Sequence, residues 1–236
     1  MKKYDFVPND YKILSDGTIV RRIRALKDFS DVKAGAYGGY IEKASNLSQE
    51  GDCWVYDKAM VYQNARVTGN AKIRNHAKIF GAANICDDAN ITCNAKIFER
   101  ATICDHAFVH DDVEIYGNAT IEDYADVSGQ VNIYHLASVY GYAKVLNRAC
   151  ICERASVYDD AYVGGKTLVC GNAEIGGDAK IYGKSVIDGG MKITDHAEIY
   201  GTKDLNVLIS SHESNNLLMN FIGGHVVIRD GKIERN

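Results

Sequence analysis

The hydrophobic positions of this chain recur every six residues over most of its length. From Val55 to Ile199, 25 successive positions at this spacing hold valine or isoleucine, and the position two residues before each is alanine in 19 cases. A helix repeats near every 3.6 residues and a strand near every 2, so neither alone produces a period of six. Two inward-facing positions on a short strand, followed by a corner of constant length, do produce it. The pattern therefore predicts an all-β fold, a parallel β-helix of hexapeptide repeats.

The polar positions agree with this periodicity. Two and three residues after each aliphatic position lie pairs rich in glycine, asparagine and aspartate, such as Gly69-Asn70, Asp87-Asp88 and Gly171-Asn172. These residue types tolerate the positive φ angles of tight turns. No residue is inserted or deleted across the 25 hexads, so we expect an uninterrupted prism without a protruding loop.

The chain divides into three predicted segments. Residues 1–54 do not follow the six-residue rule and are predicted to form an N-terminal β cap, with turn signals at Asp16-Gly17 and Gly38-Gly39. Residues 55–202 form the β-helix. Residues 203–236 are predicted to be a C-terminal capping or oligomerisation segment, with a hairpin signal at Asp230-Gly231. Caps are expected because a solenoid otherwise exposes its backbone and apolar core at both ends.

Composition narrows the functional classes. A net charge of −4 argues against nucleic acid or a membrane surface as the dominant partner. No apolar stretch has the length of a membrane-spanning helix, and the first ten residues lack the apolar core of a signal peptide. The seven cysteines, an odd number scattered through the repeats, favour a reduced, cytoplasmic chain over a disulfide framework.

The [Ile/Val]-x-x-x-Ala-x register resembles the hexapeptide-repeat acyltransferase superfamily, whose left-handed β-helices are triangular prisms with three hexads per coil. The segment RRIRALKDFSDVKAGAYGGYIEKASNLSQEGDCWVYDKAMVY looks more specifically like the YdcK-like acyltransferases of enterobacteria and prophages. The resemblance covers roughly residues 11–200. It implies a single-stranded left-handed β-helix of about eight coils, because 25 hexads at three per coil are just over eight. It also implies a homotrimer that binds acetyl-CoA or another acyl-CoA in a cleft between subunits.

Three hexads per coil place residues 18 apart above one another, about 4.8 Å apart along the axis. One face then carries a column of aromatic side chains: Tyr62, Phe80, Phe98, Tyr116 and Tyr134. Such an apolar patch is larger than a monomer usually leaves uncovered. Local stacking is one interpretation. Packing of the C-terminal segment or of another subunit on this face is the other, and it predicts a homotrimer through this wall.

A second face combines a histidine with cations. His110 lies in a column with Arg74, Thr92 and Ser128, and the neighbouring column holds Lys72, Asn90, Phe108, Asp126 and Lys144. His110 is a candidate general base, since a histidine can take a proton from an acceptor. Lys72, Arg74 and Lys144 are candidate contacts for the phosphates of a cofactor. Ordinary solvent exposure explains the same polarity.

One edge of the prism is acidic, with corner pairs that include Asp87-Asp88, Asp105-His106, Asp123-Tyr124 and Asp159-Asp160. A bound cation would offset the repulsion of stacked carboxylates, but aspartate is also a favoured corner residue. His106 lies between Asp88 and Tyr124 in this register, which makes it a second candidate for proton transfer.

No metal site is predicted. The histidines lack the spacing of the γ-class carbonic anhydrases that share this fold, and Cys150, Cys152 and Cys170 lack a fourth ligand. Cys86 lies one coil from Cys104, where oxidation could cross-link them.

Two functions remain open. The resemblance and the polar face favour an acyl-CoA-dependent acyltransferase with its site between subunits. The loop-free prism and its aromatic wall favour a non-catalytic trimer of prophage type that binds a small molecule or a protein.

Overall fold

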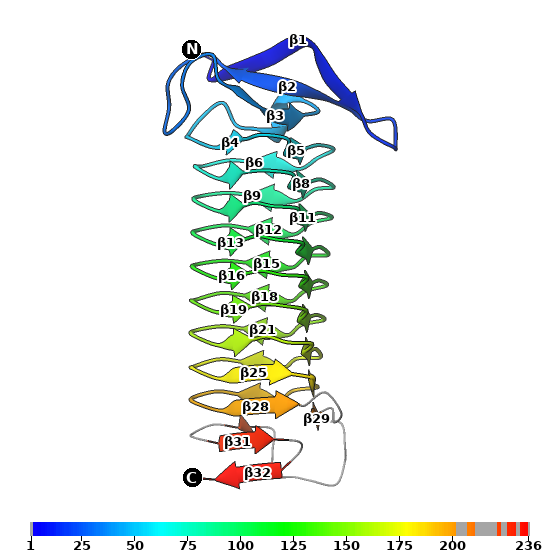
Figure 1. Cartoon of the computed structure of the whole chain (residues 1–236), viewed down its shortest axis with the longest axis vertical. Helices are drawn as coiled ribbons and strands as arrows, with labels where there is room; N and C mark the ends of the chain where they lie inside the picture. Colours follow the sequence, from blue (N-terminus) through cyan, green and yellow to red (C-terminus); the bar gives the residue numbers. More distant parts are fainter. Residues whose placement is uncertain (1, 202–206, 211–220, 223–225, 230–231, 236) are drawn as a thin grey trace.

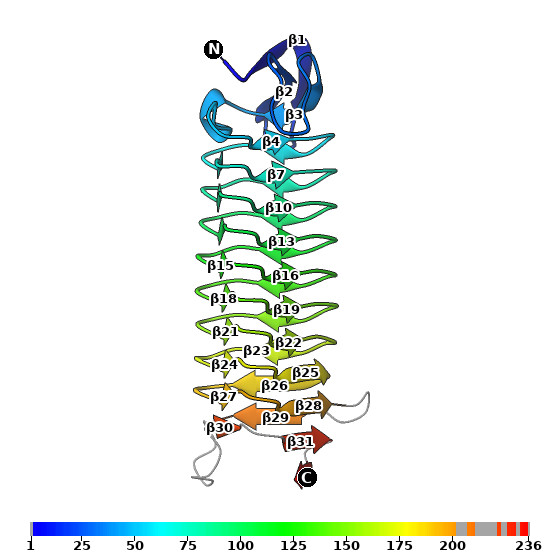
Figure 2. The same ribbon diagram turned by 90° about the vertical axis from the view of Figure 1, so that its left-hand side faces the viewer.

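The chain winds into a left-handed triangular prism (Figures 1 and 2). The computed structural model describes residues 2–201 with their side chains and the backbone of residues 207–210, 221–222, 226–229 and 232–235. Three sheets form the walls of the prism. One of these sheets has nine strands, one per turn, so the prism has about nine turns. The predicted all-β, left-handed β-helix is confirmed.

The first sheet, which we call the aromatic wall, has twelve strands. In spatial order they are β1 (Tyr4–Ile13), β2 (Ile19–Ala25), β3 (Tyr37–Ile41), β5 (Met60–Val61), β8 (Lys78–Ile79), β11 (Lys96–Ile97), β14 (Glu114–Ile115), β17 (Asn132–Ile133), β20 (Cys150–Ile151), β23 (Leu168–Val169), β26 (Ser185–Asp188) and β29 (Val207–Ser210).

The second sheet, the thiol wall, has nine strands: β6 (Arg66–Val67), β9 (Asn84–Ile85), β12 (Thr102–Ile103), β15 (Thr120–Ile121), β18 (Ser138–Val139), β21 (Ser156–Val157), β24 (Glu174–Ile175), β27 (Lys192–Ile193) and β30 (Phe221–Ile222). The third, the histidine wall, has eleven: β4 (Trp54–Val55), β7 (Lys72–Ile73), β10 (Asn90–Ile91), β13 (Phe108–Val109), β16 (Asp126–Val127), β19 (Lys144–Val145), β22 (Tyr162–Val163), β25 (Lys180–Gly183), β28 (Glu198–Gly201), β31 (Val226–Arg229) and β32 (Lys232–Arg235).

The core consists of the residues that define the repeat. The valine and isoleucine side chains from Val55 to Ile199 are fully buried, and so are the small residues two positions before them. The first residue of every corner from Asp57 to Asp195 has a positive φ, including Cys93, Glu99 and His135. The predicted tight corners are therefore confirmed. Some of these corners also hold residue types that rarely adopt a positive φ.

Successive coils stack without slippage between β4 and β28. Ile73 on β7 pairs with Ile91 on β10, and the same 18-residue register places Ile181 on β25 beside Ile199 on β28. The predicted absence of an inserted loop in this stretch is confirmed. As a consequence, each column of outward side chains runs straight along the prism.

The prism begins upstream of the uninterrupted repeat. Ile41 on β3 pairs with Val61, and Leu47, just after the short 3-10 helix η1 (Ala44–Asn46), pairs with Val67. Both pairs are 20 residues apart rather than 18, because two extra residues lie between Leu47 and Val55. Because of this insertion, the first coil does not keep the strict period of six that the later coils follow.

The N-terminal strands β1 and β2 form an antiparallel hairpin that joins the aromatic wall beside β3. Its turn is at Asp16-Gly17, where Gly17 has a φ of +85°, as predicted. The turn predicted at Gly38-Gly39 is wrong, since both glycines lie inside β3. A Cβ on Gly38 would stand 2.6 Å from the Trp54 ring, so glycine is required there for close packing.

The C-terminal strands continue the three walls. β29, β30 and β31 pair in parallel with β26, β27 and β28, and β32 pairs antiparallel with β31. These strands extend the prism past its last hexad and do not cover the aromatic column (Figure 1). The predicted hairpin turn at Asp230-Gly231 lies outside the described residues.

Among the described residues, no helix is long and apolar enough to span a lipid bilayer.

Candidate functional site

The aromatic column forms a continuous stack. Neighbouring rings, from Tyr62 to Tyr134, have centroids 4.8 to 5.1 Å apart and planes within 9° of parallel. Tyr62 is 9% exposed because the N-terminal hairpin packs on the upper end of the stack. The lower rings are half-buried. The local stacking that the sequence allowed is therefore present within a single chain.

His110 follows β13 on the histidine wall and is held between two carboxylates. Its Nε2 lies 3.2 Å from Asp126 Oδ1, and its Nδ1 lies 3.3 Å from Asp111 Oδ2. Its ring also stacks on Phe108, with centroids 4.5 Å apart. A histidine positioned by a carboxylate in this way can exchange a proton with a bound acceptor.

Two of the predicted cofactor contacts are already paired. Asp31, in the loop between β2 and β3, lies 3.5 Å from Lys72 Nζ and 3.3 Å from Arg74 Nη2. The Arg74 guanidinium also lies over the Tyr56 ring, and the Tyr56 hydroxyl donates a 2.6 Å hydrogen bond to Asp31. This hydrogen bond, together with the two cations, lowers the pKa of Asp31 to about 2. Lys72 and Arg74 therefore attach the N-terminal loop to the first coils.

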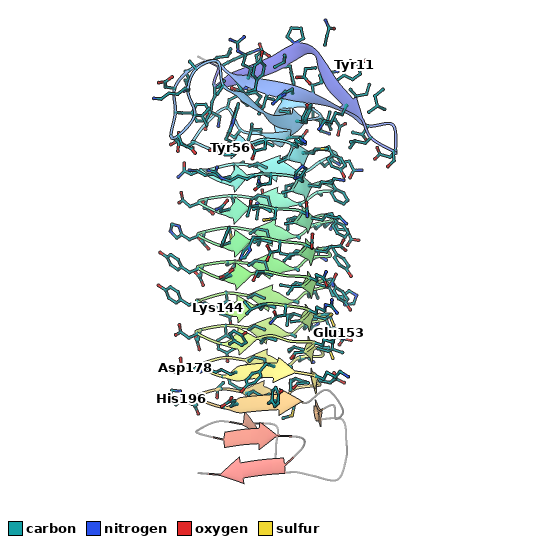
Figure 3. All side chains as sticks on the ribbon, in the orientation of Figure 1. Tyr11, Tyr56, Lys144, Glu153, Asp178 and His196 are labelled. Carbon is teal, nitrogen blue, oxygen red and sulfur yellow. The ribbon has the colours of Figure 1, made fainter. Side chains whose placement is uncertain are left out.

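The third predicted contact stands apart from that cluster. Lys144 is exposed on β19, four coils from Lys72 and two from His110, at about 4.8 Å per coil. Figure 3 shows Lys144 on the histidine wall, well below Tyr56. The structure thus places His110 and the three predicted cations on one wall but does not bring these cations together.

A cationic groove that the sequence reasoning missed follows the edge between the histidine and aromatic walls, which we call the basic edge. Arg148, Lys166 and Lys184 occupy the same corner position in three successive coils. They line an open groove of about 800 Å³ with Gly165, Gly183 and Tyr200. The sequence carries a signal for this groove, because the three cations are 18 residues apart.

The basic edge continues upward to the histidine. Asp111 and Asp112 form the corner directly after His110. Gln130 takes the position of Asp112 in the next coil, and Arg148 takes it one coil further on. Gln130 accepts a 2.9 Å hydrogen bond from Arg148 Nε. His110 and the cationic groove therefore lie along one edge of the prism, with Lys166 three coils, or about 14 Å, from His110.

His106 lies on the acidic edge, between the thiol and histidine walls. Its ring stacks on Tyr124 at 4.7 Å, and within residues 2–201 no carboxylate lies within ion-pair distance of it. The neighbouring aspartates bond to the backbone: Asp105 accepts from Asp123 N–H at 3.3 Å, and Asp123 from Gly141 N–H at 3.0 Å. Figure 3 shows Asp178 and His196 lower on this edge, where His196 Nδ1 lies 3.0 Å from Asp178 Oδ2.

The thiol wall holds a second cluster that the sequence analysis did not assign. The Sγ atoms of Cys86 and Cys104 and a carboxylate oxygen of Asp87 lie within 4.8 Å of one another. Burial raises the pKa of the Cys86 thiol to about 11, and burial beside Cys86 and Glu122 raises the pKa of Cys104. Both thiols are therefore protonated near neutral pH and are poor nucleophiles.

Fold and repeat together define a left-handed β-helix protein of the hexapeptide-repeat class. No family model matches the chain. A segment is 41% identical over 64 residues to the protein named "Uncharacterized acetyltransferase YdcK" of Escherichia coli K12, and the match covers 25% of this chain. This segment is thus similar to YdcK, which agrees with the resemblance in the sequence. The match spans 20% of the relative's length.

Proposed function

We propose that the protein is an acyl-CoA-dependent acyltransferase, with His110 as general base and the phosphates of the cofactor on the basic edge. The observation that carries the proposal is the alignment of the His110–Asp126 pair and the cationic groove along one edge. The similarity to a protein named as an acetyltransferase supports the reaction class. Because the phosphates and the thioester of acyl-CoA lie at opposite ends of an extended arm, a separation of three coils between base and cations suits this cofactor.

The proposed reaction transfers one proton through His110. A base needs one ring nitrogen free, so the acceptor has to displace one of the two carboxylates. Asp111 is 49% exposed and Asp126 is 35% exposed, so we assign the orienting role to Asp126. His110 takes the proton of the acceptor hydroxyl or amine as the new bond to the acyl carbon forms. The carbon–sulfur bond then breaks, and the departing thiolate receives this proton from the imidazolium.

The cationic groove is the proposed binding place of the phosphates. Arg148 and Lys166 are exposed, and stacked like charges about 4.8 Å apart favour a bound polyanion. Gly165 and Gly183 at the same corners contribute backbone atoms to the lining of the groove. The proposal retains Lys144, which lies in the same coil as Arg148, as an additional anion contact. Asp31 already neutralises Lys72 and Arg74, so neither is assigned to the cofactor.

The proposal includes a homotrimer that packs through the aromatic wall. This wall adjoins the basic edge, so a neighbouring subunit on it would close the groove from one side and form an intersubunit cleft. The half-buried rings of Phe98, Tyr116 and Tyr134 provide the apolar surface for such a contact.

Calorimetric titration of the intact protein with acetyl-CoA tests the binding step. We expect saturable binding that is at least about tenfold weaker in Arg148→Glu/Lys166→Glu, since two phosphate contacts become repulsive. Arg66→Glu/Arg100→Glu is the matched control, because it reverses two exposed charges away from the basic edge. Equal binding by both variants, or no binding at millimolar acetyl-CoA, would refute the proposal.

The catalytic step is tested separately in an acceptor screen that measures free CoA by chromatography. His110→Gln should lower kcat by about 10²- to 10⁴-fold and leave acetyl-CoA affinity unchanged. Asp126→Asn should lower kcat by a smaller factor, because the ring loses its orienting carboxylate. Full turnover by His110→Gln would exclude His110 as the base.

A non-catalytic binding module is the second candidate, and one observation favours it. No segment is inserted between β4 and β28, so no loop from within the repeat helps to enclose a reaction site. Acetyl-CoA binding without CoA release for any acceptor, or binding of a different anion in the groove, would favour this module.

A further inference from the structure

A pair of stacked thiols is located on the thiol wall. Cys86 directly follows β9 and Cys104 directly follows β12. The two strands pair in register, Asn84 with Thr102 and Ile85 with Ile103, so one cysteine lies directly above the other. Both side chains are half-buried and neither is in a disulfide.

Asp87 completes the cluster because its carboxylate faces the thiols. Asp105 and Asp123, which occupy the equivalent corner in the next two coils, accept hydrogen bonds from backbone N–H groups of the coil below. Within residues 2–201, Asp87 accepts no such bond from the coil below it. One of its oxygens instead lies within 4.8 Å of both sulfur atoms.

The geometry suits a tetrahedral metal site. Zn–S bonds of about 2.3 Å and Zn–O bonds of about 2.1 Å place ligand atoms roughly 3.5 Å apart. The observed separations are all within 4.8 Å, so they need to contract by at most about 1.3 Å, which small side-chain rotations supply at a half-buried surface. Glu122 lies next below Cys104 in the same column, since Ile103 pairs with Ile121, and it can provide a fourth ligand.

We propose that Cys86, Asp87 and Cys104, with Glu122 or water in the fourth position, bind one thiophilic divalent cation such as Zn²⁺. Two sulfur ligands favour zinc or cadmium over calcium or magnesium, which prefer oxygen ligands alone. On binding, each thiol loses its proton to solvent as its sulfur–metal bond forms. The ion would link two adjacent coils on the wall away from the basic edge, independently of the proposed acyl transfer.

Cadmium titration of the reduced, metal-free full-length protein tests the site. We expect a thiolate-to-metal charge-transfer band in the ultraviolet that saturates at one Cd²⁺ per chain. Excess Zn²⁺ should compete for the site and reduce the band, while Ca²⁺ should not. Cys86→Ser/Cys104→Ser should abolish the band. Cys93→Ser/Cys150→Ser, which removes two thiols outside the cluster, should retain it.

A third variant tests the carboxylate without disturbing the corner. Asp87 has a φ of +54°, and asparagine is the first corner residue with a similar φ on another edge, at Asn75 and Asn147, so Asp87→Asn preserves the backbone. We expect it to weaken Cd²⁺ binding by about tenfold or more.

Thermal denaturation gives a second readout that does not depend on absorbance. Zn²⁺ should raise the Tm of the wild type and of Cys93→Ser/Cys150→Ser, but not that of Cys86→Ser/Cys104→Ser. Absence of the band at millimolar Cd²⁺, or its equal loss in both double variants, would overturn the proposal.

Discussion

The aromatic stack provides the most direct test of how the outward columns contribute to stability. Phe98 is stacked on both sides, with its ring centroid 4.9 Å from Phe80 and 4.8 Å from Tyr116. Each stacked pair contributes about 0.5–1.5 kcal/mol beyond its buried area. Two pairs therefore give about 1–3 kcal/mol, and half-burial of the ring adds about 1 kcal/mol.

We therefore expect Phe98→Ala to lower the free energy of unfolding by about 2–4 kcal/mol. Tyr142→Ala is the control. Tyr142 stacks with Tyr124 alone, at 5.0 Å, and is 58% exposed, so its loss should cost about 1 kcal/mol. Phe98→Leu separates the two contributions, because leucine keeps much of the buried area and removes the stacking.

Guanidinium denaturation measures these differences. The single tryptophan, Trp54, is 1% exposed in the first coil and reports on that end of the prism, whereas circular dichroism reports on all coils. A repeat protein can unfold in parts, so the two signals have to coincide before one free energy is assigned. Measurement at two protein concentrations separates subunit dissociation from unfolding. A loss for Phe98→Ala no greater than that for Tyr142→Ala would refute the reasoning.

Three further predictions concern the N-terminal end. Asp31 has its pKa lowered to about 2, chiefly by the Tyr56 hydroxyl, so it stabilises the fold above its ordinary pKa. That stability, about 1 kcal/mol after solvent screening, should disappear as the pH falls from about 4 to 2, and Asp31→Asn should not show this loss in acid denaturation. Lys3 is fully buried and donates to Gly51 O at 3.1 Å and Cys53 O at 2.9 Å. Lys3→Met should cost about 1–3 kcal/mol in urea denaturation, because these carbonyls lose their donor, and an unchanged midpoint would contradict this role. Gly38→Ala should cost about 1–3 kcal/mol through overpacking against Trp54, measured by thermal unfolding, and a Tm equal to that of the wild type would contradict the close packing.

Regular features of the prism could be predicted from the chain alone, because each coil contacts only its neighbours in a constant 18-residue register. That register correctly placed Phe98 between Phe80 and Tyr116 and placed Cys86 beside Cys104. It did not reveal the coil that contains Leu47, because two inserted residues break the period there. The turn expected from the residue types at Gly38-Gly39 is wrong, because glycine is needed there for close packing.

The candidate sites depend on contacts that no period encodes. Asp31 lies in a non-repeating loop, and only its docking on the first coils shows that Lys72 and Arg74 are paired. Likewise, the register placed Asp126 one coil from His110, but the structure was needed to show that its carboxylate reaches the ring.

The sequence by itself determined the repeat, the inward and outward positions and the columns of the walls, because these follow from spacing and from burial of apolar side chains. Only the tertiary structure decided which neighbours in those columns interact. Asp105 bonds to the coil below, whereas Asp87 at the same corner position faces two thiols. Side-chain rotation and the docking of a non-repeating segment determine such contacts, and neither is set by the spacing of residues along the chain.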